Sequence, residues 1–232
     1  QAPSAHSGPA FVAWHREYVK RFEIALRLID PSISLPYWDT TLEGALADVK
    51  YSILWTDELM GSTMNGAVDV GTFAGWTNID GDTIVRNLGQ DSTRVLNYND
   101  RSLALGKMRI EQIMAYTSAR NSRATRPVAY APNNALCSSI AHFSNSTMSP
   151  FAPLQNIDGC SNDYTDNLYS YDRRPSCSFG ENCGSKYLFC DRSHGSAQCA
   201  AKIRVGQPCT GYSRGENVCY NSVCTGGVCT AV

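Results

Sequence analysis

Two histidines near the start of the sequence, His6 and His15, have side chains and a spacing that suggest metal chemistry. Nine steps of about 100° would place them on opposite sides of one helix, so they do not share a helical face. Pro9 favours the first turn of a helix, which leaves His6 in the preceding loop, free to fold back toward His15. Such a pair of imidazoles supplies a workable half of a metal site. The alternative is that His15 is a core histidine and His6 an ordinary loop residue.

The segment that carries His15 has the periodicity of a helix running from about Pro9 to Ile29. It should end before Pro31, because a residue that precedes proline is pushed out of the α region. His15 lies in the middle of one broad apolar face, while Glu23 falls on its boundary. The positions that define this face are Phe11, His15, Tyr18, Phe22, Ala25 and Ile29, and those predicted to face the other side are Arg16, Glu17, Lys20, Arg21 and Arg27.

The residues around the two histidines carry a more specific pattern. His6 is followed by Phe11, Trp14-His15-Arg16, Phe22-Glu23 and Pro36-Tyr37-Trp38-Asp39. This string resembles the first copper-binding motif of the tyrosinase family of type 3 copper proteins. Segments 71–76 and 85–89 also resemble that family, so the likeness covers about the first 115 residues. Residues 158–166 and the cysteine-rich end are similar to the C-terminal part of invertebrate, especially nematode, tyrosinase-like proteins.

The resemblance implies a helical bundle that holds two copper ions, each bound by three histidines. Such ions bind dioxygen between them and oxidise phenols to quinones, so a phenolic small molecule and dioxygen are the implied partners. By position, His6 would be the second ligand of the first copper and His15 the third. Phe11 would pack against the ligand rings. Glu23 and Asp39 would contact the ligand side chains without binding the metal, or would serve a structural role.

The number of histidines departs from the family pattern. The sequence has four, and the two besides His6 and His15 are His142 and His194. A second copper motif is expected between the segment at Lys107 and that at Asp158, where only His142 occurs. Six imidazoles cannot be drawn from four, so this chain does not support the full two-copper site. An internal loss near Leu136 and Cys137 would explain the missing motif.

Three functional interpretations remain open. The first is a copper-binding protein of the tyrosinase lineage, related to monophenol and diphenol oxidases, which has half of the first copper site and is inactive alone. The second is a secreted scaffold or binding protein that has no oxidative chemistry and is stabilised by disulfides. The third is a mononuclear copper or zinc site formed by His6, His15 and one further ligand. The catalytic residues of such a protein are not identified.

The cysteines are concentrated at the C-terminal end. Cys137 and Cys160 stand apart, and the other eight lie within the last 56 residues; they are Cys177, Cys183, Cys190, Cys199, Cys209, Cys219, Cys224 and Cys229. This density favours disulfides, since the paired C-x2-C spacing of a zinc module is missing. Disulfides indicate a secreted or extracellular protein, and the glycosylation triplet Asn145-Ser146-Thr147 agrees. The connectivity of eight cysteines does not follow from their spacing.

Composition excludes several classes of partner. The 20 basic and 21 acidic residues give a formal net charge of -1, which argues against a nucleic-acid partner. The Phe11–Ile29 stretch is broken by charged residues, so a membrane span is not expected either.

Together these patterns predict a mainly α fold with long irregular loops, in which a partial tyrosinase-type copper helical bundle precedes a small disulfide-rich module. The expected divisions are a partial copper-binding domain over residues 1–136, an irregular connection over 137–176 and the disulfide-rich module over 177–232. A second helix is expected at about residues 107–118. Much of a bundle is missing, so we expect His15 to point toward a partly open cavity. The module either caps the protein or docks it to extracellular matrix.

Overall fold

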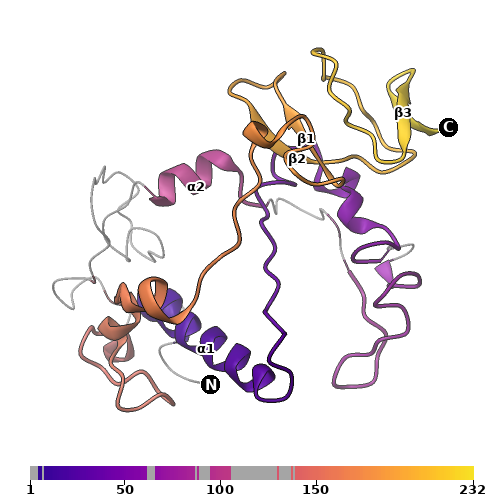
Figure 1. The fold of residues 1–232 in the computed structure, drawn as a ribbon. Helices are drawn as coiled ribbons and strands as arrows, with labels where there is room; N and C mark the ends of the chain where they lie inside the picture. The colour runs from indigo at the N-terminus through magenta and orange to yellow at the C-terminus, as the bar shows by residue number, and fades with distance from the viewer. Residues whose placement is uncertain are drawn as a thin grey trace. The chain divides into compact units, whose positions relative to one another are not determined.

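The computed structural model describes residues 5–6, 8–61, 66–86, 88, 95–105, 130, 137 and 139–232. The chain forms two compact units, and each is built from two separate stretches of sequence (Figure 1). The first unit comprises Gln1–Tyr37 and Ser102–Asp172, and the second comprises Trp38–Arg101 and Arg173–Val232. Each unit is described separately below.

The first unit is organised around helix α1 (Ala10–Arg27). Pro9 caps its N-terminus with α-region dihedrals, which agrees with the preference of proline for the beginning of a helix. The helix ends at Arg27, where the Leu28 N–H still reaches the Ile24 carbonyl, four residues before Pro31. The predicted helix is therefore confirmed, with its end two residues earlier than expected.

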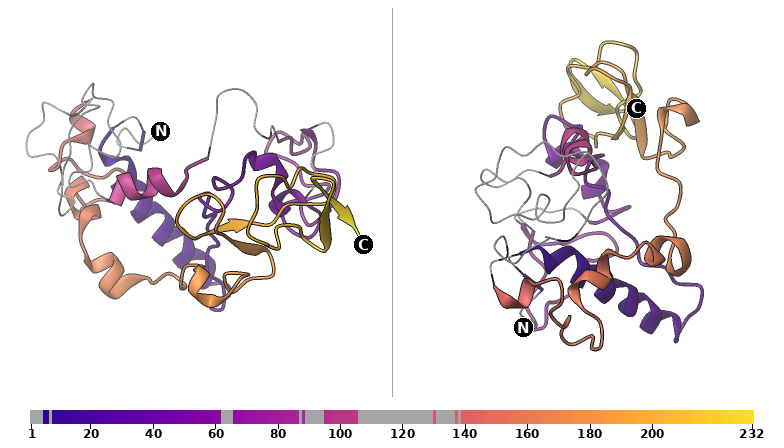
Figure 2. Two further views of the ribbon diagram at one scale, coloured as in Figure 1. Left: turned by 90° about the horizontal axis from the view of Figure 1, so that it is seen from above. Right: turned by 90° about the vertical axis from the view of Figure 1, so that its left-hand side faces the viewer.

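One side of α1 packs against the segment 139–172, which lies along the helix in Figures 1 and 2. This segment contains the short helices η5 (Ile140–His142), η6 (Asn156–Cys160) and the π-helix η7 (Tyr164–Leu168). Small side chains permit a close approach: a Cβ on Gly159 of η6 would lie 2.6 Å from the Ala13 Cβ. The buried residues of this core include Ala10, Ala13, Tyr130, Met148 and Phe151.

The second unit contains short helices and two antiparallel hairpins. The helices are η1 (Val49–Tyr51), η2 (Ile53–Trp55), α2 (Tyr98–Leu105, which extends past the end of the unit) and η8 (Cys177–Phe179). Strand β1 (Leu188–Asp191) pairs with β2 (Gln198–Ala201), and β3 (Ser222–Thr225) pairs with β4 (Val228–Ala231). The core joins Leu46 to Leu188, Phe189, Ile203 and Val218.

Four disulfides cross-link residues 177–232, which we call the cysteine-rich tail. They are Cys177–Cys190, Cys183–Cys199, Cys209–Cys224 and Cys219–Cys229. In each half of the tail the first cysteine pairs with the third and the second with the fourth. In each hairpin the third and fourth cysteines stand opposite one another, Cys190 with Cys199 and Cys224 with Cys229. The tail therefore consists of two modules with the same connectivity.

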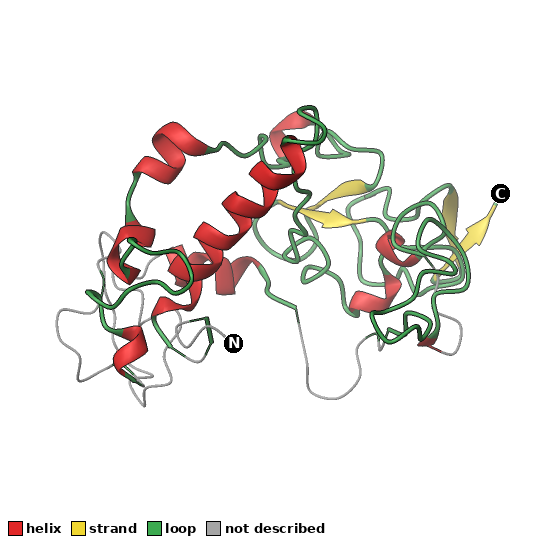
Figure 3. Cartoon of the chain, turned by 90° about the horizontal axis from the view of Figure 1, so that it is seen from below, coloured by secondary structure: helices red, strands yellow, loops and turns green. Residues whose placement is uncertain are grey.

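The prediction of a mainly α fold with a partial helical bundle is wrong. Within the described residues, the α-helices are α1, of 18 residues, and α2, of eight, and loops predominate (Figure 3). The buried side of α1 meets a 3₁₀ helix and loops, so packing against an irregular segment takes the place of a bundle. The helix expected at residues 107–118 lies outside the described residues. No helix in the described ranges is long and apolar enough to cross a bilayer. The predicted disulfide-rich C-terminal module is confirmed.

Candidate metal centre

The rings of His6 and His15 lie next to one another in the first unit. Their centroids are 5.9 Å apart and their planes meet at 73°. Each ligating nitrogen lies about 2 Å from its metal, so two imidazoles on one ion have centroids roughly 5 to 6 Å apart. His6 is exposed, in the loop before α1, and His15 is half-buried on the first turns of the helix. The loop thus returns toward the helix, as the spacing around Pro9 leads one to expect.

One hydrogen bond fixes which nitrogen of His15 is available. Its Nδ1 lies 2.8 Å from the carbonyl oxygen of Phe11, one turn earlier in α1. A carbonyl oxygen only accepts, so Nδ1 carries a hydrogen, and Nε2 is the nitrogen whose lone pair can bind a metal. Metal-bound histidines usually have this arrangement, in which the second ring nitrogen donates to a carbonyl or carboxylate.

Phe11 contributes its side chain as well as its carbonyl group. Its ring centroid lies 4.2 Å from that of His15 and 6.4 Å from that of His6. Trp14 contacts His15 from another direction, with a centroid distance of 4.8 Å. The two imidazoles therefore lie among aromatic rings, as the family resemblance implies for Phe11.

In the part of the chain that the structure describes, no third ligand accompanies the pair. Among the described residues, no group of three His, Cys, Asp or Glu side chains that includes His6 or His15 lies close enough to share an ion. The groups that meet this criterion are cysteines of the tail, and each of those cysteines belongs to a disulfide. A disulfide sulfur is not a thiolate, so these groups are not zinc sites.

His142 braces the loop that carries His6. It is 2% exposed, and its Nδ1 accepts the Ala10 N–H at 3.3 Å. Gly8 lies flat against its ring, because a Cβ there would be 2.7 Å from the ring atoms. Burial lowers the pKa of His142, although its interaction with the His6 backbone opposes this. His142 thus supports the loop that carries His6 and does so with an unprotonated Nδ1. Its isolated place in the sequence did not reveal this role.

A groove of about 1130 Å³ runs beside α1, and His15 is among its lining residues. Phe11, His15 and Glu23 line it from the helix, and the segments 34–37 and 165–172 form the rest of its wall. The cavity expected next to His15 is therefore present. The volume is slightly above the range of roughly 300 to 1,000 Å³ that is typical of small-molecule sites.

Glu23 and Asp39 both have structural partners. Glu23 accepts the Leu35 N–H at 3.0 Å, which fixes the chain after α1. Asp39 belongs to the second unit, where it pairs with Arg174 at 2.8 Å and accepts the Thr41 hydroxyl at 2.6 Å. Burial tends to raise the pKa of Asp39, but the hydrogen bonds from Arg174 and Thr41 outweigh it, so the net shift is downward.

The sequence placed Glu17 on the charged outer side of the helix, and this is wrong. Glu17 is fully buried and accepts the Tyr164 hydroxyl at 2.5 Å, and it pairs with Lys20 at 2.8 Å and Arg21 at 2.5 Å. Burial alone would raise its pKa, yet these partners hold it below its ordinary value. Glu17 therefore ties α1 to η7, which forms part of the groove wall.

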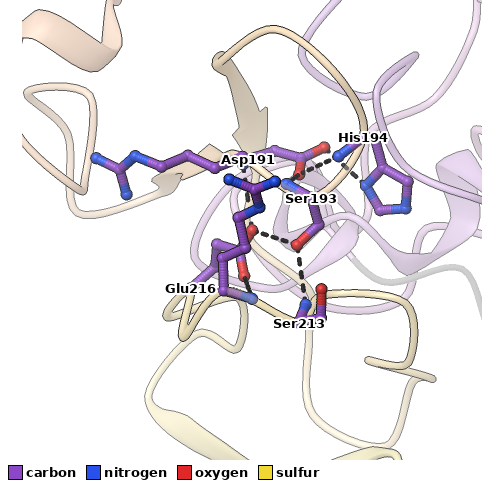
Figure 4. Close-up of polar contacts among 7 residues, drawn as sticks. Asp191, Ser193, His194, Ser213 and Glu216 are labelled. Carbon is purple, nitrogen blue, oxygen red and sulfur yellow. Dashed lines mark hydrogen bonds and ion pairs between the residues drawn. The ribbon is translucent and has the colours of Figure 1, made fainter.

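Polar contacts join the two modules of the tail (Figure 4). The Ser193 hydroxyl donates to Glu216 at 2.6 Å and accepts the Ser213 N–H at 2.9 Å. His194 Nδ1 contacts the buried Asp191 carboxylate at 2.9 Å. Burial opposes ionisation of Glu216, but the Ser193 hydroxyl and three backbone N–H groups lower its pKa to about 2. His194 is thus part of a structural network in the second unit.

Comparison with known proteins points to one family. The family profile described as the common central domain of tyrosinase matches residues 1–175. A tyrosinase-like protein of Caenorhabditis elegans is 36% identical over 288 aligned positions, which cover all of this chain and 41% of the relative. A tyrosinase of Streptomyces antibioticus is 34% identical over 93 residues, 36% of this chain and 33% of the relative. A tyrosinase-like protein of Pinctada maxima is 37% identical over 76 residues, 32% of this chain and 16% of the relative.

The matched relatives are longer than this chain, which spans about two fifths of the C. elegans protein and smaller shares of the other two. The family profile nevertheless covers most of the 232 residues, and it includes the loop and helix that carry the histidine pair. The sequence motif, the two adjacent imidazoles and these matches agree with one another. The protein is therefore a member of the tyrosinase family.

Proposed function

We propose that the chain binds a copper ion through His6 and His15 and that it holds half of the first copper site of its family. The adjacent rings carry this proposal, with centroids 5.9 Å apart and Nδ1 of His15 engaged by the Phe11 carbonyl. Imidazole nitrogen suits copper in either oxidation state. In the tyrosinase family, copper supplies oxidation of phenols by dioxygen.

The residues present do not fit the complete two-copper site. Four histidines cannot supply six imidazoles. His142 is buried with Nδ1 engaged by the Ala10 N–H, and His194 contacts Asp191 in the second unit. We therefore propose that the 232 residues do not oxidise phenols alone.

The groove beside α1 is the proposed place for a phenolic small molecule. His15 and Phe11 line it together with Tyr37, Tyr169 and Tyr171. Aromatic rings favour offset or edge-on contacts with another ring, so these side chains suit a phenol. This assignment rests on the family resemblance and on the position of the groove next to the histidine pair.

The alignment with the C. elegans relative supports an internal loss from this chain. The aligned stretch has 288 positions, whereas the chain has 232 residues, so the relative contains residues within the match that have no counterpart here. We place this loss near Leu136 and Cys137, where the second copper motif is expected. Sequencing transcripts across the junction tests it, because the absence of a longer form would reject the idea.

An extracellular location is proposed on the four disulfides. Such bonds persist in oxidising compartments and are reduced in the cytosol. The interlaced pairing in each module of the tail supports this reading, since all eight cysteines are used. The tail then serves mainly to stabilise the second unit, because cross-links restrict its unfolded chain.

Copper titration of the purified chain tests the proposal, with metal analysis after dialysis and a catechol oxidation assay. We expect about one copper ion per chain, since one pair of imidazoles is present. The variants His6→Ala and His15→Ala should lose it, while the control His194→Ala should retain it. No oxidation of catechol is expected. Copper retention in both site variants, or catechol oxidation by the wild-type chain, would contradict the proposal.

A further inference from the structure

The triplet Asn145-Ser146-Thr147 is the one place in the 232 residues where an asparagine is followed, two positions later, by serine or threonine with no proline between. This is the acceptor pattern for N-linked glycosylation. The pattern alone carries little weight, because short triplets arise by chance. The local structure supplies the second condition, which is whether the side chain is free to carry a glycan.

Asn145 lies on an exposed turn between η5 and η6. The backbone on both sides of it is fixed, because the Ser144 carbonyl accepts the Ile157 N–H and the Ser146 carbonyl accepts the Asn156 N–H, both at 3.0 Å. Thr147 continues this pairing through a bridge to Gln155. The turn is thus held to the first unit by its backbone, and the Asn145 side chain is left at the surface.

Two other asparagines of the same segment do not meet the conditions for glycosylation. Asn156 is fully buried, and its amide donates to the carbonyls of Ala141 at 2.7 Å and Phe143 at 2.8 Å. Asn162 is exposed, but Asp163 and Tyr164 follow it, so it lacks the acceptor pattern. Only Asn145 combines the pattern with exposure.

We propose that Asn145 is an N-glycosylation site. A lipid-linked oligosaccharide is the glycosyl donor: a bond forms between Asn145 Nδ2 and C1 of the first sugar, and the bond from C1 to the lipid pyrophosphate breaks. The amide loses one proton, and the lipid pyrophosphate is the leaving group. The Ser146 hydroxyl donates to the carbonyl of Ile140 in η5 at 2.6 Å, which further holds the turn in place beside Asn145. This inference is independent of copper binding.

The full chain is produced in a eukaryotic host with an added secretion leader, and the secreted protein is treated with peptide N-glycosidase. We expect one discrete gain in electrophoretic mobility on treatment, and peptide mapping should find Asn145 converted to aspartate. Asn145→Gln and Thr147→Ala should abolish the shift, whereas Thr147→Ser should preserve it. Asn162→Gln, an exposed asparagine outside any acceptor triplet, is the matched control and should behave as wild type.

Secreted wild-type protein that the enzyme does not shift, with Asn145 recovered unmodified in the peptide map, would overturn the proposal. A shift that persists in Asn145→Gln would do the same, because the glycan would then lie elsewhere. Mapping of the wild-type protein decides the matter if a variant is not secreted. Neither outcome affects the copper titration, so failure of this inference is distinguishable from failure of the proposed function.

Discussion

Replacement of Glu17 by leucine should destabilise the first unit by about 2 to 3 kcal/mol, because a buried hydroxyl would lose its acceptor. Tyr164 is 5% exposed and donates to Glu17, so its hydroxyl cannot turn to water, which costs about 1 to 3 kcal/mol. The side chains of Lys20 and Arg21 are 20% and 50% exposed, so each regains hydration and its ion pair contributes less than about 1 kcal/mol.

The assay is urea unfolding of the disulfide-intact chain, followed by far-UV circular dichroism, which reports on α1. A double-mutant cycle with Tyr164→Phe isolates the hydrogen bond, and we expect a coupling energy of about 1 to 2 kcal/mol. Arg27→Gln is the control on the same helix, since its partner Glu23 is 3.9 Å away and half of its side chain is exposed. A neutral or stabilising Glu17→Leu variant would refute the reasoning, since replacement of a buried ion pair by an apolar residue sometimes has that result.

Three further predictions concern stability. The pKa of Glu17 in the folded protein lies below its ordinary 4.5, so ionised Glu17 should stabilise the fold above that pH, and this stabilisation should be lost as the pH falls toward the folded pKa. If the free energy of unfolding of the wild type exceeds that of Glu17→Leu by the same amount in acid as at neutral pH, this prediction is wrong. Gly159→Ala should cost about 1 to 3 kcal/mol in the same unfolding assay, because its Cβ would overlap Ala13, and unchanged stability would show that the helix shifts freely. Substitution of both Cys219 and Cys229 by serine should lower stability by about 2 to 4 kcal/mol, seen as a lower thermal midpoint, and an unaltered midpoint would count against a stabilising role for this disulfide.

The position of α1 could be predicted because its signals are local. Pro9 and Pro31 bound a stretch whose apolar residues recur at helical intervals. The same periodicity misplaced Glu17, because a hydrophobicity pattern assigns a carboxylate to solvent and takes no account of a distant partner. Tyr164 is 147 residues away in sequence, so nothing near Glu17 signals that its charge is compensated in the interior.

The exposed face of α1 shows a second respect in which the apolar periodicity did not predict burial. Tyr18, Phe22 and Ile29 belong to the periodic apolar stripe, yet their exposures are 45%, 46% and 86%. The buried contact is made by Ala10 and Ala13, whose small side chains contribute little to any hydrophobic pattern but permit close packing on Gly159.

The candidate site could be predicted in part. The helix start at Pro9 allowed His6 to lie near His15, but the supporting role of His142 required contacts across 132 positions. The disulfide pairing was beyond the sequence for another reason, because eight cysteines allow many connectivities and their spacing does not select the four that form. Long-range contacts therefore account for most of what the sequence did not reveal.

X-ray absorption spectroscopy of the copper-loaded chain tests the central claim most directly, because it counts the imidazoles around the metal. The account predicts one copper environment with two imidazole nitrogens at about 2 Å and no second copper nearby. Loss of both nitrogens in a His6→Ala/His15→Ala double variant would confirm their source. Three imidazoles on each of two adjacent copper ions would contradict the account.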